Sequence, residues 1–266
     1  MSDYKISDFE NIIKENIDEK TDIVFMAGNF ANLGMFDSRN KLDLLDSVSE
    51  TVFKASKDNA TIMTQSMSFQ ICNTDIPYER YTWANLGAFS NYLLNKKNSI
   101  RSNHPFASYT ALGKNAYICD TSTPFAYGIK SPYDNMLKFD NIKMFSVGMP
   151  PNITCSIIHH AEFNMHVPYR YIKEFYHPIK IDDKIIRKNF YLHVLYKEYM
   201  AMKRNLNIKF FKYFKEKGNS IKEINLGKNK IYIYDYKKFY ESSIELLLKD
   251  IYSWMSEEPK EKPFRK

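Results

Sequence analysis

The sequence has few of the residues that build the commonest catalytic and structural sites. Its three cysteines, Cys72, Cys119 and Cys155, form no Cys-x-x-Cys pair, so neither a disulfide framework nor a cysteine zinc site is indicated. There are only 8 glycines, and the Gly-x-Gly-x-x-Gly and Gly-x-x-x-x-Gly-Lys-Ser/Thr phosphate loops are missing, which counts against nucleotide-dependent kinases and dehydrogenases. The Gly-x-Ser-x-Gly nucleophile elbow is missing too, which counts against an α/β-hydrolase.

Long apolar runs are also lacking. No segment reaches the roughly 18 unbroken apolar residues that a membrane span requires. Residues 1–20 are dense in Asp, Glu and Lys, unlike the basic start and apolar run of a secretion signal. The basic residues form no recognisable nucleic-acid-binding module. We therefore expect a cytoplasmic protein with no membrane span and no nucleic-acid partner.

The chain does have enough apolar residues for a large core, together with an uneven charge. Its 266 residues, 44% of them hydrophobic, fit a single α/β domain in which residues 171–266 form a more helical, basic C-terminal portion. From Arg170 to Lys266 there are 23 Lys and Arg against 13 Asp and Glu, although the net charge of the whole chain is only +7. This basic excess fits either attraction of a phosphate-bearing ligand, such as a nucleotide or coenzyme A, or an ordinary solvated surface.

The order of strand and helix patterns predicts the fold class. Residues 22–26 are typical of a short buried strand, and a turn of small residues follows them. Apolar residues at helical spacing begin near Lys41, and residues 60–64 are again strand-like. Strand, loop, helix and strand in this order predict an α/β fold with a mixed, largely parallel central sheet flanked by helices.

The later segments continue this pattern and then change. Ser131 followed by Pro132 predicts a helix start, because the serine can cap free N–H groups and proline suits the first turn. A strand at 142–147 and a helix at 156–163 follow. The C-terminal portion is expected to contain an irregular stretch at 171–188 with a turn at 180–183, two helical segments within 190–214, a hairpin across 221–234 and a helix at 239–254.

A histidine-rich run after the strand at 142–147 offers several kinds of chemistry. His159, Glu162 and His166 are spaced i, i+3 and i+7, which suits metal ligands or a carboxylate that orients a histidine base. The His-Glu-x-x-His zinc pattern is absent, and Pro168 disfavours helix at His166. Cys155 lies four residues before His159, which would also suit a Cys–His nucleophile pair. Metal site, histidine base, cysteine nucleophile and structural histidines all stay open on spacing alone, and we expect no metal.

Three segments resemble, in the same order, motifs of the aminoglycoside 3-N-acetyltransferase family. Arg101-Ser-Asn-His-Pro105 with Ser108 resembles the family's Arg-Ser-x-His-Pro-x-His-Ser run, and Gly128-Ile-Lys-Ser-Pro-Tyr133 resembles its Gly-x-x-Ser-Pro-Trp/Tyr helix start. Thr154, His159 and Ala161-Glu162 resemble its Asn-Thr-Ser-Leu-His-Leu-Ala-Glu run. The resemblance covers residues 99–170, and its specificity comes from the order and spacing of the three motifs together.

This resemblance implies acyl transfer from acetyl-CoA, or a related acyl-CoA, to an amino group on a sugar ring. It implies the family's own α/β fold and not the commoner N-acetyltransferase fold, whose Gln/Arg-x-x-Gly-x-Gly/Ala loop is missing here. The chemistry needs a base that deprotonates the acceptor ammonium and hydrogen-bond donors for the thioester oxygen.

Two positions depart from the family's pattern. The family's catalytic histidine precedes the serine of His-Pro-x-His-Ser, and Ala107 occupies that position here. Another group must then supply the base, with His159 oriented by Glu162 as the first choice and His104 as the second. The family's His-Ser-Ser-Leu-like turn near the N-terminus is replaced by Ala27-Gly-Asn-Phe30, so its coenzyme contacts are not carried over.

The sequence therefore predicts a CoA-dependent N-acyltransferase, with acyl-CoA and an amino sugar as its small-molecule partners and homo-oligomerisation left open. The altered histidine and the basic C-terminal portion favour a nucleotide-linked amino sugar of surface-polysaccharide biosynthesis as acceptor. The alternatives are aminoglycoside 3-N-acetylation and a catalytically silent relative that binds CoA or a sugar nucleotide. The expected catalytic residues are His159, Glu162 and His104. The expected substrate- and cofactor-binding residues are Ser108, Asn152, Thr154, Ser156, Tyr133 and Tyr169.

Overall fold

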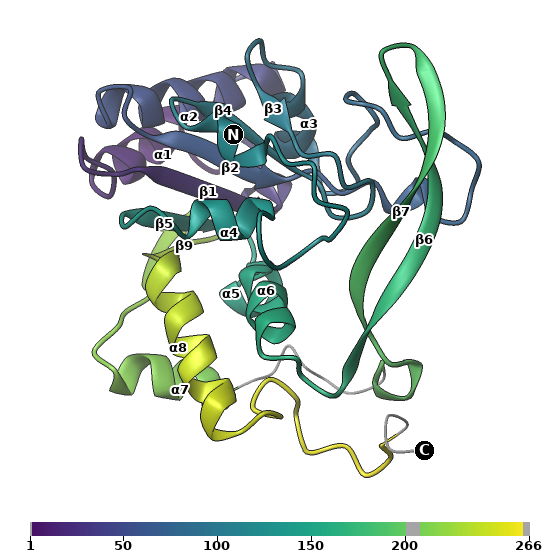
Figure 1. The fold of residues 1–266 in the computed structure, drawn as a ribbon. Coiled ribbons are helices and arrows are strands. Elements are labelled where there is room, and N and C mark those ends of the chain that lie inside the picture. Colours follow the sequence, from purple (N-terminus) through teal and green to yellow (C-terminus); the bar gives the residue numbers. More distant parts are fainter. Residues whose placement is uncertain (1, 201–207, 263–266) are drawn as a thin grey trace.

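The structure, a computed structural model, describes residues 2–200 and 208–262. Its centre is a seven-stranded sheet with the strand order β3-β4-β2-β1-β5-β9-β8 (Figure 1). The strands are β1 (Ile23–Gly28), β2 (Thr61–Gln65), β3 (Ile100–Arg101), β4 (Tyr109–Gly113), β5 (Ile142–Val147), β8 (Lys222–Leu226) and β9 (Asn229–Asp235).

Parallel pairing is confined to the middle of this sheet. Strand β1 pairs in parallel with both β2 and β5, whereas β4, β3, β9 and β8 add antiparallel strands on either side. The predicted mixed sheet flanked by helices is confirmed, with its parallel part at the centre. The carboxyl ends of β1, β2 and β5 therefore open at one edge, which is where open α/β sheets bind their ligands.

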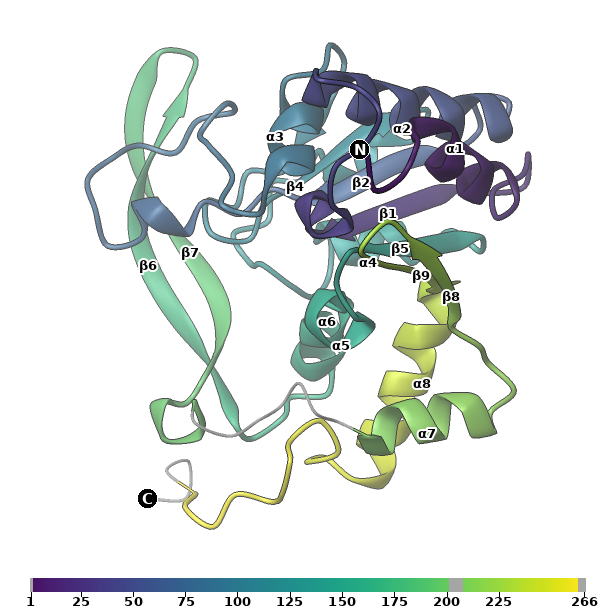
Figure 2. The ribbon, with the colours of Figure 1, turned by 180° about the vertical axis from the view of Figure 1, so that it is seen from behind.

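Helices cover both faces of the sheet (Figures 1 and 2). One face carries α1 (Ile6–Lys14), α2 (Lys41–Ala55) and α3 (Ala88–Leu94), and the other carries α4 (Pro132–Met136), α6 (Ile157–Asn164) and α8 (Tyr236–Lys249). Strand β1 supplies both cores, because Val24 and Met26 pack toward the first set of helices and Ile23 and Phe25 toward the second. This alternation is the period of two that a strand imposes on its side chains.

Within residues 2–200 and 208–262, four 3₁₀ helices and one helical turn connect these longer elements. They are η1 (Phe30–Leu33), η2 (Phe69–Ile71), η3 (Ala116–Cys119), η4 (Lys197–Tyr199) and α5 (Pro151–Thr154). The predicted start of α4 is confirmed, since Ser131 Oγ accepts a hydrogen bond of 3.3 Å from the Asp134 N–H and Pro132 occupies the first turn. In the part of the chain that the structure describes, no helix is both long and apolar enough to cross a membrane.

A long two-stranded ribbon stands beside this body (Figure 1). It consists of β6 (Arg170–Ile181) and β7 (Lys184–Leu195), paired antiparallel over their whole length. The turn is confirmed where it was predicted, with Asp182 and Asp183 both at positive φ, as the tightest hairpin turns require. The predictions of irregular chain at 171–188 and of helix from residue 190 are wrong.

The ribbon was missed because its pattern does not alternate cleanly between apolar and polar residues. Only parts of the ribbon pack against other segments: Tyr78 bridges to Ile179, and Phe125 bridges to Tyr191. Its residues are therefore buried or exposed according to which loop lies beside them, and the period-two signal that predicts a strand on a uniform core is lost.

The rest of the C-terminal portion agrees with the sequence more closely. The predicted hairpin is confirmed as β8 and β9, and the final helix is α8, which begins earlier and ends at Lys249. Helix α7 (Ile208–Glu216) overlaps the end of the range 190–214 that was predicted to be helical and extends two residues beyond it. Residues 201–207 of that prediction lie outside the described residues. Because β6 and β7 form most of residues 171–195, the described part of this portion contains more strand than helix, and the prediction that it is more helical is corrected.

Candidate active site

A cleft of about 610 Å³ opens between α6, the ribbon and the end of β2, and we call it the main cleft. It is lined by Gln65 from β2, Ser156 and His159 at α6, and Arg170 and His193 from the ribbon. A smaller hollow of about 340 Å³, the strand-end hollow, lies beyond the ends of β1 and β2 and is lined by residues that include Gln65 and Ile153 of the main cleft. The two cavities therefore adjoin at the ligand-binding edge of the sheet.

The turn after β5 positions α6 beside the main cleft. Gly148 has φ +63°, and a Cβ there would lie 2.4 Å from the Asn29 carbonyl oxygen, so the close approach of the two loops requires glycine. Pro150 and Pro151 then start α5, and the hydroxyl of Thr154 bonds that of Ser146 at the end of β5. The loop is thus tied to the sheet immediately before the histidine-bearing helix begins.

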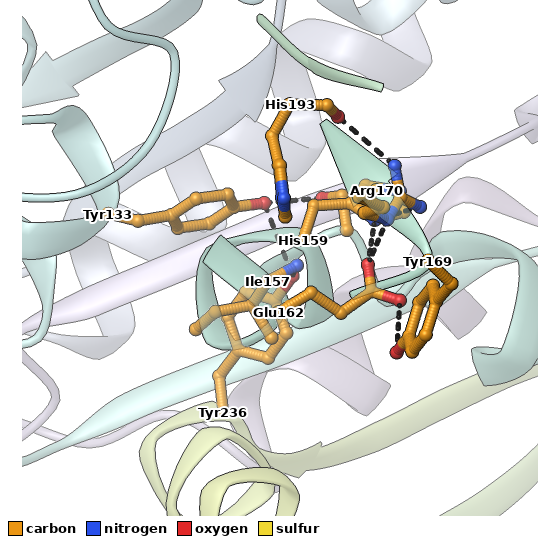
Figure 3. A network of polar contacts seen from close by, with 9 residues as sticks. Tyr133, Ile157, His159, Glu162, Tyr169, Arg170, His193 and Tyr236 are labelled. Atoms are coloured by element: carbon orange, nitrogen blue, oxygen red, sulfur yellow. Dashed lines mark hydrogen bonds and ion pairs between the residues drawn. The ribbon is translucent and has the colours of Figure 1, made fainter. Parts of the chain in front are cut away.

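Glu162 is the centre of a buried polar network (Figure 3). Its carboxylate is fully buried, with Oε2 2.8 Å from Arg170 Nε and 2.9 Å from His159 Nδ1. Its other oxygen, Oε1, accepts a hydrogen bond of 3.0 Å from the Tyr169 hydroxyl. A buried carboxylate needs such partners to remain charged, and here both oxygens have them.

His159 is the exposed end of this network. Its side chain is 31% exposed and lines the main cleft, and its Nδ1 lies within reach of both Glu162 Oε2 and Arg170 Nη2, at 2.9 and 3.1 Å. Nδ1 can serve only one of them at a time, because it must carry a proton to donate to the carboxylate and must lack one to accept from the guanidinium. In the tautomer that donates to Glu162, Nε2 carries the lone pair, which is the arrangement of an oriented general base.

Arg170 ties the ribbon to α6. Its side chain is 6% exposed, its Nε pairs with Glu162, and its Nη1 donates a hydrogen bond of 3.1 Å to the carbonyl oxygen of His193 on β7. Sequence reasoning missed both Arg170 and His193, since neither belongs to the histidine-rich run. The available signal was the position of Arg170, next to Tyr169 and directly after that run.

Hydroxyl groups connect the main cleft to the core. The Ser156 hydroxyl, at the cleft wall, bonds the buried Tyr133 hydroxyl, which lies 3.5 Å from that of Tyr236. The Tyr236 oxygen in turn accepts a hydrogen bond of 3.1 Å from the N–H of Ile157. Burial raises the pKa of Tyr133 well above its ordinary value, so the phenol is a hydrogen-bond donor at neutral pH.

Of the remaining predicted binding residues, some line a cavity and others lie behind the residues that do. Asn152 lines the main cleft beside Ser156, and Thr154 lines the strand-end hollow. Tyr169 is fully buried behind Glu162, and Tyr133 is likewise fully buried, so both reach a ligand only through the groups that they hold. The interpretation of these two tyrosines as direct binding residues is therefore corrected to one of support.

His104 and Ser108 are turned away from the cleft, which corrects their predicted roles. The His104 Nδ1 accepts hydrogen bonds from the N–H groups of Phe106 and Ala107, and Nε2 lies 3.2 Å from the Tyr191 carbonyl oxygen. Burial lowers the pKa of His104 to about 4, so the ring is neutral and both nitrogens serve the backbone. Ser108 is fully buried, donates 2.6 Å to the Ser66 carbonyl and accepts from Arg101. Both residues brace a turn.

Ala107 itself lines the main cleft. His166, the third member of the predicted i, i+3, i+7 set, lies past the end of α6 at φ +49° and is exposed. Cys155 is buried and precedes α6, where its carbonyl accepts from the Ile158 N–H. No group of three or more His, Cys, Asp or Glu within residues 2–200 and 208–262 could hold a metal ion.

Comparison with protein families identifies this arrangement. The model of the family described as aminoglycoside 3-N-acetyltransferase matches residues 47–247, about three quarters of the chain. The chain belongs to this family. No curated protein matches it at a comparable level of significance.

Solved structures of aminoglycoside acetyltransferases share the fold at low sequence identity. The apoenzyme of aminoglycoside acetyltransferase AAC(3)-IVa is 18% identical, with a TM-score of 0.71 over 94% of this chain and 91% of that one. AAC-IIIb in a binary complex with CoASH is 15% identical, with a TM-score of 0.73 over 92% and 96%. The YokD protein from Bacillus subtilis is 16% identical, with a TM-score of 0.69 over 91% and 99%. The predicted fold is thus confirmed over nearly the whole chain, and the family over residues 47–247.

Ala107 and three polar side chains form part of the cleft wall. Ala107 contributes only a methyl group where the sequence motif of the aminoglycoside 3-N-acetyltransferases places a histidine, and His159, Arg170 and His193 line the same cleft. Imidazole groups are therefore still available in the cleft, but they come from α6 and β7.

Proposed function

We propose that this protein transfers an acetyl, or related acyl, group from acyl-CoA to the amino group of an amino sugar. The observation that carries the proposal is the pairing of His159, at the cleft wall, with the buried carboxylate of Glu162. Family membership supports N-acyl transfer as the reaction class. A metal is not part of this proposal.

The proposed reaction assigns the proton to His159. An amino-sugar ammonium is not nucleophilic, so the amine must first lose a proton, and a histidine oriented by a carboxylate is a suitable acceptor near neutral pH. The amine nitrogen then forms a bond to the thioester carbon and the C–S bond breaks. His159 releases this first proton to solvent, takes a second proton from the nitrogen and gives it to the sulfur. The third proton stays on the amide nitrogen, and the products are the amide, free CoA and the released proton.

The strand-end hollow is the proposed site for the reactive end of the coenzyme. Its described wall is made of uncharged groups, among them the Ala27–Phe30 turn and Thr154, and it adjoins the main cleft. A relative of the same fold was solved with CoASH. An uncharged channel suits the neutral pantetheine arm, and basic residues of the C-terminal portion would attract the phosphates.

Two classes of acceptor are proposed for the main cleft. Solved relatives in complex with a gentamicin and with sisomicin support an aminoglycoside. The described lining favours a less cationic amino sugar, because its one ionised side chain is that of Arg170 and the carboxylate of Glu162 behind it is neutralised by the same residue. The nucleotide-linked amino sugar inferred from the sequence belongs to this second class.

An acceptor panel tests the proposal. The purified protein is mixed with acetyl-CoA and either aminoglycosides or nucleotide-linked amino sugars, and the released CoA thiol is measured. We expect release with at least one amino sugar and faster release with the less cationic class. No release across the panel would contradict the proposal, and stabilisation by CoA in a thermal-shift assay without release would identify a catalytically silent binding protein.

The His159→Ala variant tests the assigned base. We expect turnover to fall by about a hundredfold or more, because general-base catalysis contributes factors of this size. Stabilisation by CoA in the thermal-shift assay should be retained, because His159 lines the acceptor side. The exposed His166→Ala, seven residues along the chain, is the matched control and should leave the rate unchanged. An unchanged rate in His159→Ala would remove His159 from the mechanism.

A further inference from the structure

His193 is a second histidine of the main cleft, and it comes from the ribbon. It lies on β7 opposite Ile172 of β6, is 8% exposed, and its ring lines the cleft together with His159 and Arg170. Figure 3 shows His193 beside the Glu162 network, joined to Arg170 through its backbone carbonyl. The residue thus belongs to the part of the cleft wall that the ribbon supplies.

Burial of the His193 ring leaves one of its nitrogen atoms without a hydrogen-bond partner among the described residues. Its Nδ1 is buried with no hydrogen-bond partner among the described residues, and such atoms are uncommon because an unsatisfied buried polar group is destabilising. Among the described side chains with an orphaned atom of this kind, His193 and Trp254 line the main cleft. A histidine that lines a cleft and has a buried nitrogen without a partner is a candidate for contact with substrate.

The position of this ring is fixed from two sides. Phe163 of α6 meets it edge to face, with ring centroids 5.5 Å apart at 89°, and the His193 carbonyl is held by Arg170. The same guanidinium pairs with Glu162, so one residue sets the distance between the His193 backbone and the carboxylate that orients His159. Arg170 therefore helps to position both His159 and His193.

The surroundings of His193 keep its imidazole neutral. Burial, followed by the nearby Arg170 cation, lowers the pKa of His193 to about 3, with His159 and His166 adding smaller effects in the same direction and Glu162 opposing them. His193 therefore stays neutral at physiological pH and is a poor base, but it keeps one N–H that can donate a hydrogen bond. Pairs of ionisable groups whose surroundings separate their proton affinities are typical of divided catalytic roles.

We propose that the neutral imidazole of His193 donates a hydrogen bond to the thioester carbonyl oxygen of the bound acyl-CoA. This rests on the proposed acyl transfer and adds the group that stabilises its developing charge. When the amine nitrogen bonds to the carbonyl carbon, the C=O electron pair moves onto the oxygen, where the His193 N–H strengthens its hydrogen bond. As the C–S bond breaks, the electron pair returns to form the amide carbonyl and the second amine proton passes by way of His159 to the sulfur. His193 keeps its proton throughout.

Matched substitutions on the two ribbon strands test this role. His193→Phe removes the donor and keeps a ring of similar size, whereas His193→Gln keeps an N–H donor. The control is His177→Phe on β6, because His177 is also buried and has an orphaned Nε2, but it lines a different hollow. We expect His193→Phe to lower kcat by about a hundredfold with little change in the KM for acetyl-CoA, as for the loss of a donor used in the transition state.

The other variants complete the comparison. His193→Gln should recover a clear part of the lost kcat, and His177→Phe should keep the wild-type rate. A kcat for His193→Phe within twofold of wild type would overturn the proposal, as would equal losses in both His193 variants when their melting temperatures match that of wild type. If His193→Phe does not fold, His193→Gln decides: a rate at least one tenth of wild type with unchanged KM supports the donor role, and a lower rate overturns it.

A second readout separates this proposal from the acyl-transfer proposal. A ketone analogue of acetyl-CoA, with a methylene group between sulfur and carbonyl, keeps the oxygen but cannot react. We expect this analogue to shift the imidazole ¹⁵N resonances of His193 and not those of His177. A shift of the His193 resonances with no turnover of any acceptor would support the contact between His193 and the carbonyl and would contradict acyl transfer. Turnover without a shift would contradict only the role of His193.

Discussion

At the scale of single residues, the site depends on one buried carboxylate. Glu162 is fully buried, and its oxygens are held by Tyr169, Arg170 and His159 at 3.0, 2.8 and 2.9 Å. Burial of an isolated charge would be strongly unfavourable, so the Arg170 pairing is what allows an ionised carboxylate to stand behind His159. The same contact that neutralises Glu162 thus preserves its ability to orient the imidazole.

Replacement of Glu162 by Gln should destabilise the fold as well as slow the reaction. The amide can still accept from Tyr169, but it leaves the buried Arg170 guanidinium without a counter-charge, a change that typically costs about 3–5 kcal/mol of unfolding free energy. Urea denaturation measures the loss. Glu19→Gln, at the exposed ion pair with Lys57, is the control and should leave the midpoint unchanged. A loss of unfolding free energy below about 1 kcal/mol in Glu162→Gln would mean that the ion pair of Glu162 with Arg170 is not desolvated as described.

At the scale of elements, the ribbon of β6 and β7 completes the cleft. Helix α6 and the turn after β5 supply His159 and Ser156, but Arg170 and His193 come from the start of β6 and the end of β7. The full antiparallel register between the strands places these two residues near each other at the base of the ribbon. The two-residue turn at Asp182 and Asp183 sets that register, since hairpin register follows from turn length.

The ribbon turn offers a stability test that leaves the site untouched. Asp183 has φ +63°, a conformation that glycine adopts without the strain of a side chain. Asp183→Gly should therefore raise the melting temperature slightly and leave turnover unchanged. Asp183→Val should lower the melting temperature, because a β-branched residue is poorly tolerated at positive φ. Differential scanning calorimetry distinguishes the two, and an equal melting temperature for both variants would contradict the turn geometry.

At the scale of the whole molecule, several histidines are buried in their neutral form. Burial lowers the pKa of His104 and of His160 to about 4, and that of His193 to about 3. An unfolded chain binds a proton on each of them near pH 6.5. Between that pH and the lower folded pKa values, the unfolded state therefore holds more protons than the folded state, and stability falls as the pH falls.

Acid sensitivity should follow directly from these groups. From pH 6.3 to pH 5, where most carboxylates remain ionised, each buried neutral histidine contributes a slope of up to about 1.4 kcal/mol per pH unit. The free energy of unfolding, measured in urea across this range, should fall steeply in the wild type. His104→Gln should make the fall shallower by about one such slope, whatever its effect on absolute stability. An identical slope in the variant would show that His104 is not buried in its neutral form.

Local sequence patterns were sufficient for much of the molecule. The capped start of α4, the hairpin of β8 and β9, and the helical segment that carries His159 and Glu162 follow from neighbours in the chain. Capping, turn chemistry and i, i+3 spacing depend on residues within one or two turns of each other. Spacing alone left the role of His159 open, and the family resemblance made its pairing with Glu162 the first choice.

Other residues could be placed only by long-range packing. His104 and Ser108 belong to the family motif as firmly as His159 does, yet their side chains brace backbone groups of β7 and of the loop after β2. Nothing in the local pattern distinguishes a histidine that faces a cleft from one that faces a carbonyl, because the difference is made by segments far away in the chain.

The sequence by itself therefore determined the α/β class, the family and the histidine–carboxylate pair on α6. Only the tertiary structure decided that Arg170 and His193 join this pair, that Tyr133 and Tyr169 support it from behind, and that His104 does not take part. The physical reason is that secondary structure and capping arise from near neighbours, whereas the face that a ribbon residue presents depends on register and on the elements packed beside it.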